Sequence, residues 1–189
     1  MKSIIDPSAE VNPTVWVNPE NVIIEKNVII GAQCAIGTNS TVAEREHIIV
    51  GKKIRKDLEG QLIIREGADI GALCSLALGS NVVGKTIIDK NVIIGASCIV
   101  AHDVVIGEES IVVGGSNIAG YVTIGKKCRI GPSSVLRERL KIGDGSIISL
   151  GSTVTQDVEP GKRVTGYFAI DHELFLKDFK ERIMRLTGK

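Results

Sequence analysis

Aliphatic residues recur at every sixth position from Ile64 to Val154. Each of these positions holds Ile, Leu or Val: Ile64, Ile70, Leu76, Val82, Ile88, Ile94, Val100, Ile106, Val112, Ile118, Ile124, Ile130, Leu136, Ile142, Ile148 and Val154. The residue four places after each of them is nearly always Ala, Cys, Ser, Thr or Val. A six-residue period with one large and one small inward position is the signature of a parallel β-helix built from hexapeptides. The repeat therefore predicts an all-β fold.

The same period runs through an earlier block, at Ile24, Ile30, Ile36 and Val42. The step from Val42 to Ile64 is not a multiple of six, so residues 43–63 are predicted to leave the β-helix as a loop excursion. Residues 5–21 resemble a first, less regular coil. The β-helix domain is accordingly expected over residues 1–166.

The hexapeptide period ends after Pro160, and the chain closes on the run DHELFLKDFKERIMRL. Asp171 suits the capping position of a helix. One apolar face would then carry Phe175, Phe179, Ile183 and Leu186. We therefore expect a C-terminal α-helical extension over residues 167–189, docked on the β-helix or on a neighbouring subunit.

Composition narrows the class of partners. The chain has a net charge of +1, 43% hydrophobic residues, only 3% aromatic residues and 21 glycines. Such a composition suits short strands joined by tight corners, and the near-zero charge gives no broad surface for nucleic acid or an anionic membrane. No apolar run approaches the roughly 18 residues of a membrane span, and the N-terminus lacks the apolar stretch of a signal peptide. We expect a cytoplasmic protein.

The four cysteines follow the repeat. Cys34, Cys74, Cys98 and Cys128 all fall in the small inward column, where a thiol acts as a compact apolar group. No C-x-x-C motif is present. Catalytic or metal-binding cysteine is therefore not expected.

The segment GASCIVAHDVVIGEESIVVGGSNIAGYVTIG resembles the hexapeptide-repeat acyltransferases. Within that superfamily it is most similar to the lipid A glucosamine N-acyltransferase and to sugar acetyltransferases of the sialic-acid and bacillosamine type, which share an aliphatic-x-H-[DNE]-x-x-I-G motif followed by G-G and A-G. The resemblance implies a left-handed parallel β-helix with three hexapeptides per coil, assembled as a homotrimer. It also implies acyl transfer from coenzyme A, most simply as acetyl-coenzyme A, with no metal.

His102 is the candidate catalytic residue. With three hexapeptides per coil, its column would read Glu66, Gly84, His102, Gly120, Glu138 and Gln156, leaving the outward imidazole between two glycines. Histidine suits a general base at neutral pH. The resemblance implies that the Gly120 backbone N–H stabilises the oxyanion and that Asp103 orients the base. The competing interpretation is a solvated corner histidine with no function.

Further basic residues are candidates for binding phosphates. Arg137 and Arg139 lie in the corner column of His102 and would hold a nucleotide-sugar or coenzyme phosphate, although a solvated charged corner explains them as well. The segment GKRVTGYFA resembles the closing segment of the superfamily, beside which coenzyme A lies. This resemblance makes Lys162, Arg163 and Gly166, together with Gly120, the expected contacts of the cofactor.

Two departures from the lipid A enzyme affect the choice of substrate. Arg139 stands where that enzyme has a second histidine, and Ala96 replaces a polar residue ahead of the histidine motif. These differences argue against the lipid A reaction and favour a smaller acyl group or a different nucleotide-sugar. The leading interpretation is transfer of an acyl group to an amino group of a nucleotide-linked sugar. Sugar O-acetylation and transfer from acyl carrier protein stay open, as do a non-catalytic scaffold and a β-helical zinc carbonic anhydrase, which needs three histidine ligands.

Overall fold

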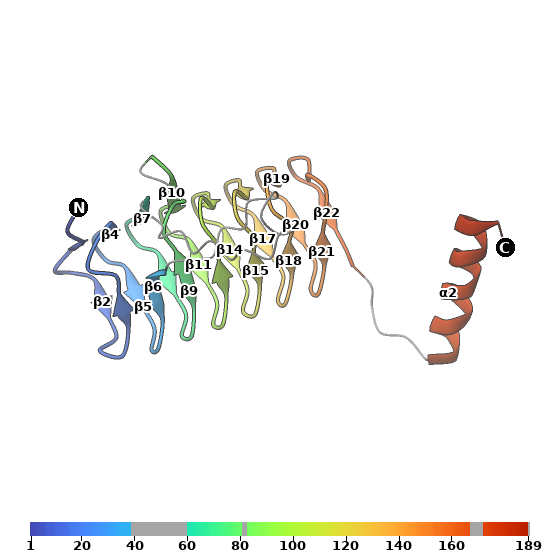
Figure 1. Cartoon of the computed structure of the whole chain (residues 1–189), viewed down its shortest axis with the longest axis horizontal. Coiled ribbons are helices and arrows are strands. Elements are labelled where there is room, and N and C mark those ends of the chain that lie inside the picture. Colours follow the sequence, from blue (N-terminus) through green and yellow to red (C-terminus); the bar gives the residue numbers. More distant parts are fainter. Residues whose placement is uncertain (39–59, 81–82, 167–171, 189) are drawn as a thin grey trace, which may run out of the picture.

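The computed structural model of the chain describes residues 1–38, 60–80, 83–166 and 172–188. Its strands form three parallel sheets, and the chain visits the first, second and third sheet in turn before it returns to the first. The strands stack as successive coils along one axis (Figure 1). The structure is therefore the β-helix that the repeat predicts, and its hand is left, as in the solved structures that share the fold.

The first sheet contains, in spatial order, β1 (Ile4–Ile5), β4 (Val22–Ile24), β7 (Gln61–Ile64), β10 (Lys85–Ile88), β13 (Val105–Ile106), β16 (Thr123–Ile124) and β19 (Lys141–Ile142). The second contains β2 (Glu10–Val11), β5 (Ile29–Ile30), β8 (Asp69–Ile70), β11 (Ile93–Ile94), β14 (Ile111–Val112), β17 (Arg129–Ile130), β20 (Ile147–Ile148) and β22 (Arg163–Val164). The third contains β3 (Trp16–Val17), β6 (Ala35–Thr38), β9 (Ser75–Ala77), β12 (Ile99–Val100), β15 (Asn117–Ile118), β18 (Val135–Leu136) and β21 (Thr153–Val154).

Two inward columns fill the core. In β11, β13 and β16, for example, the aliphatic residue that ends the strand is buried, whereas the residue before it points outward, as strand geometry requires. The small column is buried too, and all four cysteines are at most 2% exposed, as expected. Its polar members are satisfied, since Ser110 Oγ donates to the Gly125 carbonyl at 2.7 Å and Cys128 Sγ to that of Gly143 at 3.1 Å.

The strand register shows that the coils differ in length. Ile88 pairs with Ile106, which lies three hexapeptides further along the chain, but Ile64 pairs with Ile88, which lies four hexapeptides further along. One coil thus holds an extra hexapeptide, and we call residues 79–84 the corner insertion. They lie between β9 and β10, where the third sheet leads into the first. Backbone hydrogen bonds from Gly60 to Gly79 and from Gln61 to Gly84 tie both ends of this insertion to the neighbouring coil.

The corner insertion corrects the column expected through His102. Because its length equals one hexapeptide, the insertion keeps the repeat in phase while it shifts the stacking by one sheet. Glu66 consequently follows β7 at the corner between the first and second sheets, where its carboxylate contacts Lys26 and Lys90. Because Val100 pairs with Leu76, the backbone position below His102 corresponds to Leu78 and not to Gly84.

The loop excursion expected over 43–63 falls mainly on residues outside those that the structure describes. β6 ends at Thr38 and β7 begins at Gln61, so the last residues of the expected range lie in a strand. This excursion enters at the same corner as the corner insertion, because it also connects the third sheet to the first.

The C-terminal end holds a helix. α2 (His172–Thr187) is drawn beyond the last coil in Figure 1. Three apolar side chains of the expected face, Phe179, Ile183 and Leu186, are 50%, 42% and 83% exposed, and the Phe175 side chain lies outside the described part. In the described ranges, no helix has the length and apolar character needed to cross a membrane.

Candidate active site

One corner of the β-helix contains five of the candidate site residues expected from the sequence. The turns from the third sheet to the first contain His102 and Asp103 between β12 and β13, Gly120 between β15 and β16, and Arg137 and Arg139 between β18 and β19. We call this edge the site corner. The described ends of the corner insertion, residues 79–80 and 83–84, lie on it as well, one coil before His102.

His102 and Asp103 form a direct pair. His102 Nδ1 lies 3.0 Å from Asp103 Oδ2, and each side chain is only 12% exposed. Asp103 adopts a left-handed backbone conformation (φ 56°) that other corner residues share, and its N–H donates to Thr86 Oγ1 at 2.9 Å. The carboxylate therefore holds Nδ1 of the imidazole and leaves Nε2 as the nitrogen available to a substrate.

Gly120 lies against the imidazole of His102. A Cβ atom built on Gly120 would stand 2.7 Å from Cε1 and 2.8 Å from Nε2 of His102, closer than real Cβ contacts. Only glycine lets the ring lie so near the backbone. Among the described residues, the Gly120 amide has no hydrogen-bond acceptor. The Gly120 N–H is thus a backbone donor on the residue that lies against His102 Nε2, the nitrogen that a substrate would approach.

Two residues of this site were missed by sequence reasoning. Tyr121 packs edge-on against His102, with ring centroids 4.9 Å apart, and its hydroxyl lies 3.1 Å from Ser80 Oγ. The Ser80 backbone N–H donates to Asp103 Oδ2 at 3.0 Å. Tyr121 could have been found, because it is one of only two tyrosines and directly follows Gly120. Ser80 had no such signal, since the repeat assigns it to the small inward column.

The two candidate arginines of the site corner differ. The Arg139 guanidinium carbon lies 4.4 Å from the centre of the Tyr121 ring, a cation–π contact that joins Arg139 to the site. Arg137 is exposed on the same corner, and its backbone N–H donates to the Val154 carbonyl. Arg139 is therefore joined to His102 through Tyr121, whereas Arg137 lies on the same corner without such a contact among those described.

The residues expected to contact coenzyme A lie elsewhere on the chain. Lys162 is exposed at the corner that leads from the first sheet to the second, and Arg163 lies on β22 with its Nε 3.4 Å from Ser149 Oγ. The Gly166 N–H donates to Ser152 Oγ at 2.9 Å. Within one chain, the structure does not bring Lys162, Arg163 and Gly166 to His102.

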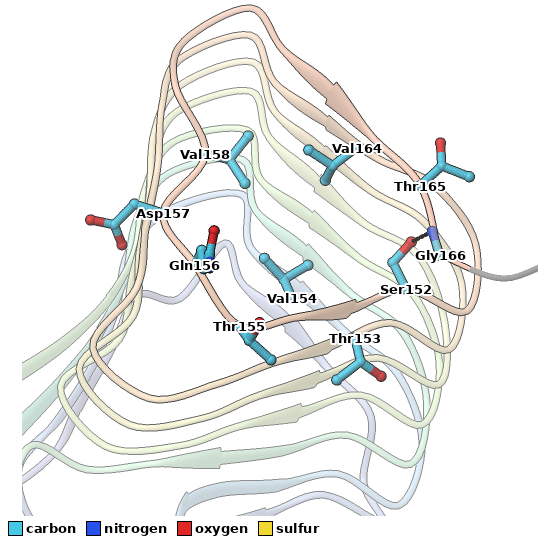
Figure 2. A pocket seen from close by; sticks show the side chains of 10 residues that line it. All are labelled: Ser152, Thr153, Val154, Thr155, Gln156, Asp157, Val158, Val164, Thr165 and Gly166. Atoms are coloured by element: carbon cyan, nitrogen blue, oxygen red, sulfur yellow. Dashed lines mark hydrogen bonds between the residues drawn. The ribbon is translucent and has the colours of Figure 1, made fainter. Parts of the chain in front are cut away.

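A cavity of about 220 Å³ opens at the C-terminal end of the β-helix, away from His102. Figure 2 shows Val154, Val158 and Val164 pointing towards the axis of the last coil, with the hydrogen bond between Ser152 and Gly166 at the rim. This cavity is the uncovered end of the core. In the residues that the structure describes, no group of three or more His, Cys, Asp or Glu side chains could hold a metal ion.

Comparisons with known proteins agree with the repeat and with the fold. The family model described as the hexapeptide repeat of succinyl-transferase matches residues 21–53 and 121–156. The sequence matches no curated protein. The resemblance to hexapeptide-repeat proteins is thus confirmed at the level of the repeat and the fold.

Solved structures with the same coil architecture include LpxA and two enzymes named UDP-N-acetylglucosamine acyltransferases. LpxA from Acinetobacter baumannii is 23% identical, with a TM-score of 0.59 over 94% of this chain and 76% of that one. The UDP-N-acetylglucosamine acyltransferase of Francisella novicida is 20% identical, with a TM-score of 0.60 over 93% and 71% of the two chains. The enzyme of the same name from Campylobacter jejuni is 18% identical, with a TM-score of 0.58 over 98% and 85%.

Proposed function

We propose that the protein is an acyltransferase that moves an acyl group, most simply acetyl, from coenzyme A to an amino group of a nucleotide-linked sugar. The observation that carries this proposal is the His102–Asp103 pair beside the Gly120 amide. The fold adds support, because proteins named UDP-N-acetylglucosamine acyltransferases have the same coil architecture.

His102 is the general base of this proposal. In this proposal the His102 Nδ1–H donates a hydrogen bond to Asp103 Oδ2, so Nε2 carries the lone pair that takes a proton from the attacking amine. The amine nitrogen bonds to the thioester carbonyl carbon, and the carbon–sulfur bond then breaks. The proton held by His102 passes to the departing thiolate, which leaves as free coenzyme A. The pair therefore serves both halves of the reaction.

The Gly120 amide is the proposed donor to the oxyanion. When the amine attacks, the carbonyl oxygen becomes negatively charged, and a fixed N–H aimed at it lowers the barrier. The amide belongs to the residue that lies against His102 Nε2. Base and oxyanion donor would then act on the same thioester carbonyl.

The remaining candidates are proposed to bind phosphates. Arg137 and Arg139 on the site corner suit the diphosphate of a nucleotide-sugar. Lys162, Arg163 and Gly166 are proposed to contact coenzyme A from a neighbouring copy in a homotrimer, because they lie on other edges of the same chain.

The test is an assay of acyl transfer with acetyl-coenzyme A and a panel of nucleotide-linked amino sugars, in which the released coenzyme A thiol is measured. We expect thiol release with at least one amino sugar and none with its counterpart that has a hydroxyl in place of the amine. Turnover on the hydroxyl sugars alone would mean O-acylation, and turnover only with acyl carrier protein would overturn the donor. If the protein neither binds nor turns over any thioester, the interpretation as a non-catalytic scaffold would stand.

A further inference from the structure

We propose that Ser80 and Tyr121 are positioning residues that hold His102 and Asp103 in their reactive geometry. This inference rests on the proposed function, in which His102 is the base. Neither residue touches a reacting atom in that mechanism. Their role follows instead from the contacts that each makes with the pair.

The four residues form a closed ring of contacts. Ser80 Oγ lies 3.1 Å from the Tyr121 hydroxyl, and the Ser80 N–H donates to Asp103 Oδ2 at 3.0 Å. Asp103 Oδ2 holds His102 Nδ1 at 3.0 Å, and the imidazole packs edge-on against the Tyr121 ring, at an interplanar angle of 85°. Since each residue has two neighbours in the ring, none can move without disturbing at least two contacts.

The ring joins three consecutive coils. Ser80 belongs to the coil before His102, and Tyr121 to the coil after it, so their hydrogen bond passes over the coil of the pair. The backbones of those outer coils are about 10 Å apart, twice the strand spacing, and the long tyrosine side chain covers this distance. The bond therefore encloses His102 and Asp103, in agreement with their 12% exposure.

Tyr121 is itself fixed on its other side. The Arg139 guanidinium lies over its ring, and the Tyr121 N–H donates to the His102 carbonyl at 3.0 Å. Ser80 is 6% exposed, so its hydroxyl has little access to water as an alternative partner. Loss of either hydroxyl would therefore release the same contact and loosen the same imidazole.

The test compares Tyr121→Phe, Ser80→Ala and the double variant, which remove one hydrogen bond and keep the tyrosine ring and the Ser80 backbone N–H. A neutral hydrogen bond corresponds to roughly 2- to 10-fold in an equilibrium or a rate. We expect kcat to fall by about this factor in each single variant, with KM little changed. The double variant should be no worse than the singles, because both lose the same bond.

A second readout does not depend on turnover. The exchange of the His102 Nδ1 proton with water, followed by nitrogen-edited NMR, should speed up by about 2- to 10-fold in the same variants. The control is Ser116→Ala, which removes a buried hydroxyl bonded to the Val113 and Gly131 carbonyls at another corner. It should lower stability without changing that exchange.

The two readouts separate the proposals. Unchanged proton exchange in Tyr121→Phe and Ser80→Ala would overturn the positioning role, whatever the activity. So would multiplicative losses of kcat in the double variant. A third outcome is faster exchange in Tyr121→Phe and Ser80→Ala together with full activity in His102→Ala. This outcome would support the ring of contacts but overturn His102 as the base.

Discussion

The imidazole of His102 and the backbone of Gly120 approach each other so closely that no methyl group fits between them. An added Cβ would meet Cε1 and Nε2 at 2.7 and 2.8 Å, so the ring would have to move aside. The ring is not free to move, because Asp103 and Tyr121 hold it on two other sides. A small change at Gly120 is thus transmitted to Nε2, the nitrogen that we propose as the base.

We predict that Gly120→Ala lowers kcat by roughly 10- to 100-fold, since a misplacement of about 1 Å near a reacting group can cost about 100-fold. Steady-state kinetics with the true acceptor measures this. The matched control is Gly114→Ala, whose added Cβ would meet the Ala96 carbonyl oxygen at 2.9 Å at a different corner. That variant should lose stability but keep kcat, and equal losses of kcat in the two variants would contradict the prediction.

Part of the site could be predicted from the sequence. His102, Asp103 and Gly120 are recognisable because a local motif carries the first two and stacking in steps of three hexapeptides brings the third beside them. Ser80 and Tyr121 were not, because their roles depend on side chains that meet across three coils. Ser80 in particular depends on the corner insertion, which the hexapeptide count cannot detect.

The corner insertion is the element that distinguishes the coil before His102. Its length equals one hexapeptide, so the aliphatic columns before and after it stay in phase and the core continues without a break. The insertion instead adds residues to the surface of the site corner, among them Ser80, which contacts Asp103 and Tyr121. Without residues 79–84 the coil could therefore still close, but the contacts that Ser80 makes with Asp103 and Tyr121 beside His102 would be lost.

We predict that deleting residues 79–84 leaves a folded β-helix, because Leu78 would then lead into Lys85 and the coil would have the regular three hexapeptides. Activity should fall by about 10- to 100-fold, since the Asp103 carboxylate loses the Ser80 N–H, a charge-assisted hydrogen bond. Circular dichroism and a thermal melt check the fold, and kinetics checks the site. A deletion variant with full activity would contradict this account.

The periodic elements of the chain were predictable, whereas the irregular ones were not. Each regular coil follows from six-residue steps, because one large and one small inward residue suffice to specify a strand and its corner. The last corner departs from this, since Ile148 pairs with Val164, which falls short of three full hexapeptides. This strand register depends on pairing between neighbouring coils, and counting residues along the sequence does not reveal that pairing.

The whole molecule is a three-sided stack whose first sheet presents an apolar outer face next to the site corner over β4, β7, β10 and β13. Ile23, Ile63, Ile87 and Val105 stand one above the other on that face, and each is half-buried in the single chain. Aliphatic residues aligned in this way suit contact with another copy of the chain. This face would place a neighbouring subunit beside His102.

We predict a homotrimer with three times the 20.2 kDa of one chain, measured by light scattering at micromolar concentration. Ile87→Lys should reduce the measured mass, because it would bury a charge in the contact. Lys127→Ala, which changes an exposed corner between the first and second sheets, is the control and should keep the trimer. A wild-type protein with the mass of a single chain would contradict this assembly.

The most direct test of the account is the rate of acyl transfer in His102→Ala, set against His172→Ala on α2, an exposed histidine far along the chain from the site corner. We predict that His102→Ala lowers kcat by roughly 100- to 10,000-fold, the usual contribution of a general base, with the melting temperature nearly unchanged. His172→Ala should retain the wild-type rate. Near wild-type turnover in His102→Ala would contradict the assignment of the base.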